Sequence, residues 1–329
     1  MSKARSILIL RTHLDDERLL LPPVVGSSLL ARQLQALSEI WSQIVIFLPL
    51  AADKLRQNIR QIALELPIRI VTLNIDPQFS FWSELARTRQ RWPEKSVLGF
   101  LRDLSLPFAC GQLAAYRADL TCVTSDKKPG LSDGVARVPG RFVTGVASVS
   151  VRDGQYLTGA YQTSQAFWQH LPAGLMSDQD WREFITDFAA DHAVKTCLLT
   201  TDADLPIFLP SDTSQKHREK LYPLAWRYLA QSEPMVVGSA RLAPTCRLSE
   251  LTTLGADCQL ADLVVTSGRN YLGPRTQVGP FCSLTHVIAE NDVVIDPYSN
   301  LHDCYLPAHT HVKTQISTQI VSRETKTAG

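Results

Sequence analysis

The stretch from Val236 to about Val312 decides the fold; it begins VVGSARLAPTCRLSELTTLGADCQLADLVVTSGRNYLGPRTQVGPFCSLTH. Read in steps of six from Val236, it places an aliphatic residue on almost every step, and only Thr266 breaks the series. The aliphatic steps are Leu242, Leu248, Leu254, Leu260, Leu272, Val278 and Leu284. A period of six fits neither an α-helix nor an alternating strand. It fits a chain that turns a corner every six residues and points each aliphatic side chain into a triangular prism.

This pattern matches the hexapeptide repeat of left-handed parallel β-helices, in which three hexads make one coil. Residues 236–289 would then form about three coils. After Leu284 the period is interrupted by what reads as an extra residue within 288–292, and Ile295, Leu301 and Leu306 resume it for one more coil. The alternative is a sandwich of short strands with Gly and Pro turns. The repeat favours the solenoid.

The chain has 329 residues, of which 45% are hydrophobic and 20% are charged. This composition is typical of a soluble globular protein. A net charge of +1 gives no electrostatic signature for nucleic acid or for an acidic membrane surface. The apolar run Ile7–Leu10 is too short for a signal peptide or a membrane span, so a cytoplasmic location is expected. Seven cysteines without a CxxC pair predict neither disulfides nor a zinc site. Three of them, Cys246, Cys258 and Cys282, fall where the prism needs a small filler.

Before residue 234 short apolar runs alternate with amphipathic segments. Strands are expected at 6–10, 44–48, 68–73, 97–101, 120–124, 143–151, 194–199 and 207–209. Helices are expected at 29–40, 53–66, 80–91, 160–171, 177–190 and 214–230. This alternation predicts a doubly wound α/β domain with a mostly parallel sheet. The expected regions are therefore the α/β domain at 1–233, the solenoid at 234–316 and a polar tail at 317–329.

A doubly wound domain followed by a hexapeptide solenoid resembles the sugar-nucleotide pyrophosphorylases, which are sugar-1-phosphate nucleotidyltransferases. LLPPVVGSSLLARQLQAL at 20–37 is similar to the family's Pro-Val-x-Gly turn and the helix after it. VLGFLRD at 97–103 is similar to the strand that ends in the family's metal-binding Asp, and LPSDT at 209–213 to its Asp-x-Gly-Thr-Pro segment. The resemblance covers nearly the whole chain and implies a nucleotidyltransferase-like (GT-A, Rossmann-like) first domain.

The resemblance also implies four catalytic parts: a Gly-rich loop after the first strand, an Arg within it, a Lys shortly after, and Mg²⁺ held by two Asp residues. Glycine is needed because the backbone must approach the phosphates closely. Here the loop reads RTHLDDER at 11–18, without glycine and with a carboxylate run that reads as a solvated loop. Arg11 or Arg18 stands in for the Arg, and the Lys is absent. Asp103 carries over as a metal ligand, whereas the second ligand position holds Pro210 and the nearest carboxylate is Asp212.

The solenoid suggests acyl transfer as a second possible activity, because many hexapeptide-repeat proteins are acyltransferases that use a His as general base. Imidazole suits that role near neutral pH. His286 and His302 fall just after steps of the repeat, where a side chain could project from the prism. Exposed turn positions are the plainer interpretation of these histidines.

The prediction is a nucleotidyltransferase-like protein of sugar-nucleotide or polysaccharide metabolism that no longer transfers nucleotides and serves as a regulatory, scaffold or assembly subunit. One alternative is a divergent Mg²⁺-dependent nucleotidyltransferase, and another is a hexapeptide-repeat acyltransferase. A cofactor, Mg²⁺, is expected only if the chain is active. Expected partners are a nucleotide sugar or sugar phosphate, further copies of the chain through the solenoid, or an active paralogue; no nucleic acid and no membrane span are expected.

Overall fold

The computed structural model describes residues 6–11, 21, 23–76, 79–88, 97–101, 118–126, 134–148, 154–172, 177–198, 214–313 and 316–317. The chain forms two compact units. The first unit comprises Met1–Leu21 and Leu30–Pro210, and the second comprises Pro22–Leu29 and Ser211–Gly329. The second unit therefore holds a short turn from near the N-terminus in addition to the C-terminal part. The expected limits 1–233, 234–316 and 317–329 stay predictions.

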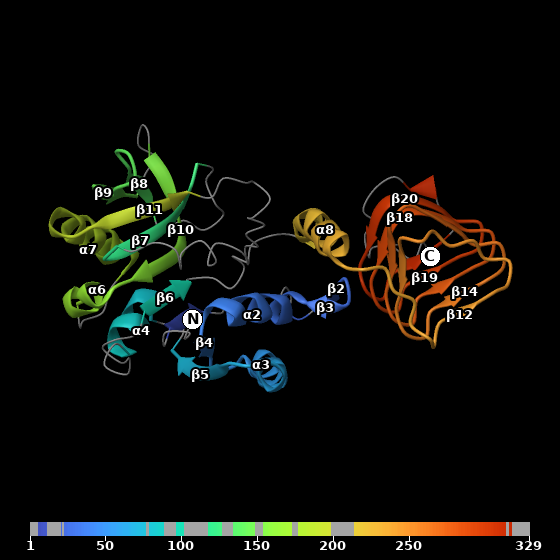
Figure 1. Cartoon of the computed structure of the whole chain (residues 1–329), viewed down its shortest axis with the longest axis horizontal. Helices are drawn as coiled ribbons and strands as arrows, with labels where there is room; N and C mark the ends of the chain where they lie inside the picture. Colours follow the sequence, from blue (N-terminus) through green and yellow to red (C-terminus); the bar gives the residue numbers. More distant parts are fainter. Residues whose placement is uncertain are drawn as a thin grey trace, which may run out of the picture. The chain divides into compact units, whose positions relative to one another are not determined.

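One mixed sheet forms the centre of the first unit (Figure 1). Its strand order is β11-β7-β10-β6-β1-β4-β5, and all neighbours pair in parallel except those of β10. The bounds are β1 (Ser6–Arg11), β4 (Gln43–Pro49), β5 (Arg69–Ile75), β6 (Val97–Leu101), β7 (Leu120–Ser125), β10 (Gly154–Thr163) and β11 (Val194–Leu198). Two short strands, β8 (Val135–Arg137) and β9 (Gly145–Ala147), extend it beside β10. Leu8, Ile9 and Leu10 are fully buried, as expected for a strand inside a parallel sheet.

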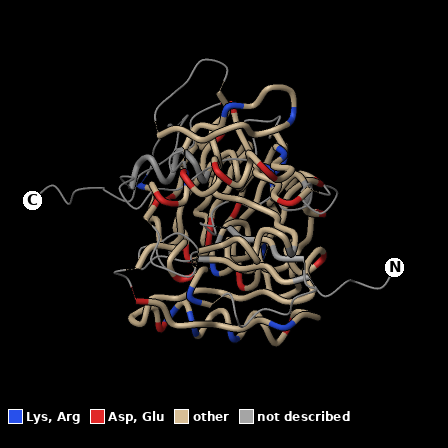
Figure 2. Tube along the Cα trace, turned by 90° about the vertical axis from the view of Figure 1, so that its left-hand side faces the viewer, with Lys and Arg blue, Asp and Glu red and all other residues tan. Residues whose placement is uncertain are grey.

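Helices pack against this sheet. They are α2 (Leu29–Ile40), α3 (Asp53–Glu65), α4 (Phe81–Thr88), α6 (Gln165–His170) and α7 (Asp178–Asp191), and the last three bury aromatic side chains in the core. Trp82 and Trp181 stack with ring centroids 3.6 Å apart, and Tyr161 meets both edge-on. A capping box between Ser177 and Asp180 fixes the start of α7. Basic and acidic residues are interspersed along the trace (Figure 2), and the buried carboxylate of Glu84 in α4 is paired with Arg87 at 2.8 Å.

The predicted helix at 160–171 is wrong in its first part. Gly154–Thr163 forms β10, which pairs antiparallel with both β6 and β7, and the helix α6 begins only at Gln165. The pairing of β10 with β7 shifts register between Leu157 and Tyr161, where Gly159 has φ +83°. A glycine at positive φ permits such a bulge. Tyr, Leu and Thr side chains on either side of it favour a strand.

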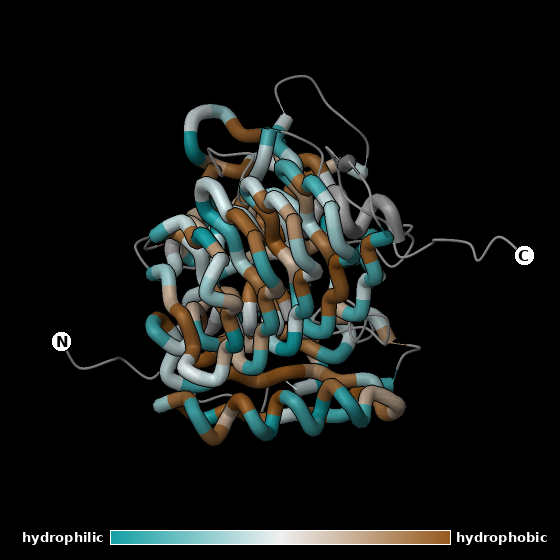
Figure 3. Tube along the Cα trace, turned by 90° about the vertical axis from the view of Figure 1, so that its right-hand side faces the viewer, coloured by the Kyte–Doolittle hydropathy of each residue, from teal (hydrophilic) through white to brown (hydrophobic). Residues whose placement is uncertain are grey.

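The C-terminal part of the second unit, residues 235–313 with the short strand at 316–317, is called the repeat region. It contains two sheets of short strands that pair in parallel. One sheet is formed by β12 (Arg241–Leu242), β14 (Gln259–Leu260), β17 (Gln277–Val278), β19 (Val294–Ile295) and β21 (His311–Val312). The other is formed by β13 (Thr252–Leu254), β15 (Val265–Ser267), β16 (Asn270–Leu272), β18 (Ser283–Ala289), β20 (Asn300–Leu306) and β22 (Ile316–Ser317). Hydrophobic residues recur at the same place in successive turns of the chain (Figure 3).

Each strand of the repeat region pairs with the strand one turn of the chain later; one such turn is called a coil. Leu254 pairs with Leu272, which lies three full hexads later in the sequence. Leu272 then pairs with Ala289, and Ala289 with Leu306, and each of these coils is one residue short of three hexads. The extra residue expected within 288–292 is therefore wrong: the chain has one residue fewer, between Leu284 and Ala289. The left-handed winding stays a prediction.

Three columns of residues with positive φ mark the corners of the coils. The charged corner consists of Asp257, Arg275, Asp292 and His309; the aromatic corner of Leu263, Phe281 and Tyr298; the histidine corner of Gly268, His286 and Asp303. Arg275 binds Asp292 with two contacts of 2.6 Å, and this hydrogen bonding lowers the pKa of Asp292. Phe281 and Tyr298 stack 5.0 Å apart in parallel planes. The charged corner thus carries a polar or charged side chain in every coil, whereas the histidine corner changes from Gly268 to His286 and Asp303.

The inside of the repeat region is filled by the aliphatic steps and by small residues between them. Leu254, Leu272, Leu284 and Leu301 are fully buried. Cys258 and Cys282 lie in the same core, and their thiols contact main-chain carbonyl oxygens of the next coil. Burial also raises the pKa of the Cys304 thiol, to about 12. Cys258 and Cys282 act as compact apolar fillers, as the sequence predicted.

A glycine is required where one coil rests directly on the next, and this gives a test. A methyl group at Gly255 would lie 2.5 Å from the backbone nitrogen of Pro274. We expect Gly255→Ala to lower the free energy of unfolding by about 1–3 kcal/mol, the usual range for overpacking. Thermal unfolding measures the change. The matched control is Gly238→Ala, whose methyl group would meet nothing within 4 Å; equal melting temperatures for the two variants would contradict the stacking argument.

Candidate functional site

The sheet of the first unit has a topological switch point beside β1. The chain passes from β1 to β4 and β5 on one side and then crosses to β6 on the other side. Leu10 of β1 pairs with Ile46 of β4 and with Leu101 of β6, so the carboxyl ends of these strands meet at one edge. Ligands of open α/β sheets bind outside the carboxyl ends of the strands at such a point. The segments that follow β1 and β6 are therefore where a ligand site of this unit is expected.

The residues predicted for nucleotidyl transfer belong to those segments. Arg11 is the last residue of β1, and its side chain is outside the described part of the structure. Arg18, Asp103 and Asp212 lie outside the described residues altogether. Within the residues described, no group of three or more His, Cys, Asp or Glu side chains could hold a metal ion. The predicted roles of these four residues, and of Mg²⁺, stay predictions.

The predicted histidines, in contrast, meet at the histidine corner of the repeat region. His286 Nδ1 lies 3.1 Å from Asp303 Oδ1, and His302 Nδ1 lies 2.6 Å from Asp303 Oδ2. The two imidazole rings are 6.1 Å apart between centroids. All three side chains are about half exposed. One carboxylate thus lies between two histidines on the surface of the repeat region.

His286 is held on two sides. Its Nδ1 contacts Asp303, and its Nε2 edge lies over Gly268 of the preceding coil, where any Cβ atom would collide with the ring. The indole of Trp226 meets the ring edge-on at 5.9 Å. Because Nδ1 is directed at Asp303 and the ring lies over Gly268, His286 is suited to fixing Asp303 in place.

His302 has the arrangement of a general base. With Nδ1 directed at Asp303, the acceptor nitrogen of its neutral ring is Nε2, and a carboxylate that orients an imidazole in this way is typical of proton-transfer sites. Sequence reasoning missed Asp303 and Gly268. Two signals were available: Asp303 directly follows His302, and it stands one shortened coil after His286.

Helix α8 (Ser214–Gln231) braces the histidine corner. The Tyr222 hydroxyl donates to the carbonyl oxygen of Asp303 at 3.1 Å. Burial is the main cause that raises the pKa of Tyr222, so this hydroxyl remains a donor. Arg269 Nη1 donates to the carbonyl oxygens of Leu229 and Ser232, at 2.9 and 3.0 Å, and so caps the end of α8.

The Pro-Val-x-Gly turn that resembles the nucleotidyltransferases lies against the repeat region. It forms the hairpin of β2 (Pro23–Val24) and β3 (Ser27–Ser28). The amide of Val25 donates to Oε1 of the fully buried Glu290 at 2.8 Å. Gly26 has φ +79°, and a Cβ atom there would lie 2.9 Å from the Tyr271 hydroxyl. Burial and the neighbouring Glu290 raise the pKa of Tyr305 well above its ordinary value, so the phenol stays protonated beside the carboxylate.

Comparison with known proteins gives a partial match. No protein-family model matches the sequence. A segment of 112 residues is 30% identical to the bifunctional protein GlmU of Wigglesworthia glossinidia brevipalpis; it covers 31% of this chain and 23% of that protein. The chain therefore matches less than a quarter of the length of this relative.

Two solved structures show a distant likeness. The crystal structure of HddC from Yersinia pseudotuberculosis aligns with a TM-score of 0.46 and 13% identity, over 68% of this chain and 99% of that one. The inositol-1-phosphate CTP transferase of T. maritima aligns with a TM-score of 0.48 and 9% identity, over 68% and 97%. These likenesses are too weak to establish a shared fold. Among the described residues, no helix is long and apolar enough to cross a membrane.

Substitution of Arg269 tests whether its hydrogen bonds hold the end of α8 beside the histidine corner. We expect Arg269→Ala to reduce stability by about 1–3 kcal/mol, because two hydrogen bonds from a charged group are lost. Amide hydrogen exchange should accelerate in the last turn of α8 as it frays. The control is Arg247→Ala, an exposed arginine of the same region. Unchanged exchange in α8 with Arg269→Ala would show that the cap does not hold the helix.

Proposed function

We propose that this chain is a sugar-nucleotidyltransferase-like protein that does not transfer nucleotides and serves as a regulatory, scaffold or assembly subunit. The observation that carries the proposal is the sequence of the segment that follows β1 at the switch point. Its residues 11–18 include no glycine and three consecutive carboxylates. A triphosphate needs closely approaching backbone N–H groups, and adjacent carboxylates repel it.

The family assignment within this proposal rests on the three resembling segments and on the partial match to GlmU. The three-hexad spacing of the parallel strands supports the further proposal that the repeat region is a left-handed β-helix of hexapeptide repeats. Such solenoids associate readily, so we extend the proposal to self-association through the repeat region. An active paralogue is the other partner that a subunit of this kind would have.

The proposal predicts no release of pyrophosphate. Purified protein would be incubated with Mg²⁺ and a panel of nucleoside triphosphates and sugar 1-phosphates, and pyrophosphate would be measured. We expect wild type and Asp103→Asn to give the same background. Release by wild type that Asp103→Asn abolishes would instead establish a working Mg²⁺-dependent enzyme with Asp103 as a ligand, with Asp212 as the nearest candidate for the second.

A second candidate function, acyl transfer, is favoured by one observation: the contact between His302 and Asp303. In that mechanism His302 Nε2 takes the proton of an attacking hydroxyl or amine while Asp303 orients the ring. His302→Ala would then lower kcat by about 10²–10⁴ with an acyl-CoA donor. His286→Ala would lower it less, because it affects His302 only through Asp303. Equal acyl transfer by wild type and His302→Ala would exclude this assignment.

A further inference from the structure

The first coil of the repeat region leaves its aliphatic steps open to solvent. Val236 and Leu242 are 52% and 40% exposed. Leu254 and Leu260, which pair with them one coil later, are 0% and 3% exposed. At the other end of the region the step Val312 is buried. The apolar core is therefore covered at its last step and uncovered at its first, and this first coil is called the open end.

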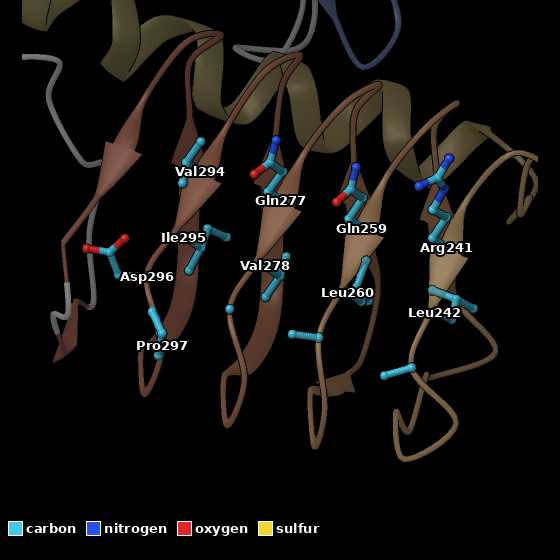
Figure 4. A pocket seen from close by; sticks show the side chains of 13 residues that line it. Arg241, Leu242, Gln259, Leu260, Gln277, Val278, Val294, Ile295, Asp296 and Pro297 are labelled. Carbon is cyan, nitrogen blue, oxygen red and sulfur yellow. The ribbon is translucent and has the colours of Figure 1, made fainter.

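The main chain of the open end also presents hydrogen-bonding groups. Among the described residues β12 is the terminal strand of its sheet, and Figure 4 shows it, with Arg241 and Leu242, at the end of the row. Arg241 N donates to Cys258 O at 2.7 Å. Ala243 N donates to Leu260 O at 3.0 Å, so both amides point to the second coil. Because successive residues of a strand direct their main-chain groups to opposite sides, the N–H and C=O of Leu242 point outward as a template for another strand.

The open end is complementary to its own image. A half-turn about an axis that crosses β12 at Leu242, at right angles to the stacking direction of the coils, sets two open ends face to face. β12 then runs antiparallel to its image, and Leu242 exchanges both N–H···O=C bonds with Leu242 of the second copy. Arg241 lies opposite Ala243 of the second copy, so the two arginines are not paired. The other two sides of the coil change places, which sets Val236 of each copy over Leu248 of the other.

The rise of the coil suits this half-turn. The segment at Val236 begins the coil and projects furthest, whereas the segment at Leu248, two hexads later, is recessed by about two-thirds of the rise of one coil. The half-turn sets the projecting segment of each copy over the recessed segment of the other. All three sides can therefore meet at one strand spacing, about 4.8 Å.

Two corners of the open end carry short hydroxyl side chains. Ser239 and Thr245 stand one coil before Asp257 and Leu263. Their hydroxyl oxygens accept from the amides of those two residues, at 3.0 and 2.9 Å. The half-turn brings Ser239 of one copy beside Thr245 of the other. The contact therefore desolvates no charged group at these two corners, a step that would oppose association.

We infer that the open end is the docking surface for a second copy of this chain, stacked end to end about a two-fold axis. The inference rests on the self-association proposed above and adds its face and its symmetry. A second copy is the occupant because its own open end supplies a strand edge and uncovered aliphatic side chains at matching places, as an isologous interface requires. The face is one coil, residues 236–253, smaller than the about 20–30 residues that each partner gives to a standard interface. The dimer should therefore be reversible.

Sedimentation of the full chain over a range of concentrations tests the inference. We expect a concentration-dependent dimer that Leu242→Lys weakens by about tenfold or more, because like charges then meet on the axis. The matched control is Leu263→Lys, which adds the same charge outside the open end, at an aliphatic residue that is 47% exposed. This control should associate as wild type does, and equal weakening by both variants would contradict the proposed face.

Disulfide cross-linking tests the register and decides the matter even if Leu242→Lys folds poorly. Arg241 and Ala243 of the second copy would form a non-hydrogen-bonded pair with Cα atoms about 4.5 Å apart, a distance that a disulfide spans. With Arg241→Cys and Ala243→Cys together, oxidised glutathione should join two copies. Each single variant should give only the background of the native cysteines.

The outcomes separate the interface from the assembly role. A dimer that Leu242→Lys leaves intact, and that the two introduced cysteines do not join, would overturn this interface and keep the assembly role. A monomer at every concentration, without a cross-link, would overturn both the interface and the self-association.

Discussion

Main-chain hydrogen bonding between successive coils is the constraint on which the repeat region depends. In one column Gly255 N donates to Leu272 O, Gly273 N to Ala289 O, and Glu290 N to Leu306 O, at 2.7–2.9 Å. These bonds keep every coil in register, so equivalent positions become continuous columns. The corners must then adopt positive φ, which costs non-glycine residues roughly 1–2 kcal/mol each. The stacked backbone and the buried aliphatic core offset that strain.

A difference of one residue decides what the histidine corner can do. Ser267 pairs with Thr285, and Tyr271 pairs with Ile288. Between these pairs the earlier coil has three residues, Gly268 to Asn270, whereas the next coil has two. Its additional length lets Arg269 reach the end of α8. The two shortened coils instead bring His286 directly beneath Asp303, where the carboxylate also meets His302. The same corner thus supplies a helix cap in one coil and a candidate proton-transfer pair in the next two.

Much of the repeat region could be predicted from the sequence, because a six-residue period is a local property that each hexad repeats. The strands β1, β4, β6 and β7 were readable for a similar reason, as short apolar runs. The strand β10 was not, because its pairing depends on Leu98–Leu101 and Leu120–Ser125, which are distant in sequence. Asp303 was missed because its contact with His286 depends on the length of a coil, which the interrupted period obscured. The metal-ligand roles of Asp103 and Asp212 remain predictions from the sequence.

The turn at Pro22–Leu29 has a consequence for the modularity of the chain. It packs with the repeat region, whereas the segments before and after it belong to the α/β unit. The polypeptide therefore passes between the two units three times, and neither is an uninterrupted stretch of sequence. A recombination event that moved only the C-terminal part would leave Glu290 without the amide of Val25 and uncover Tyr271. The two units are for this reason expected to be inherited together.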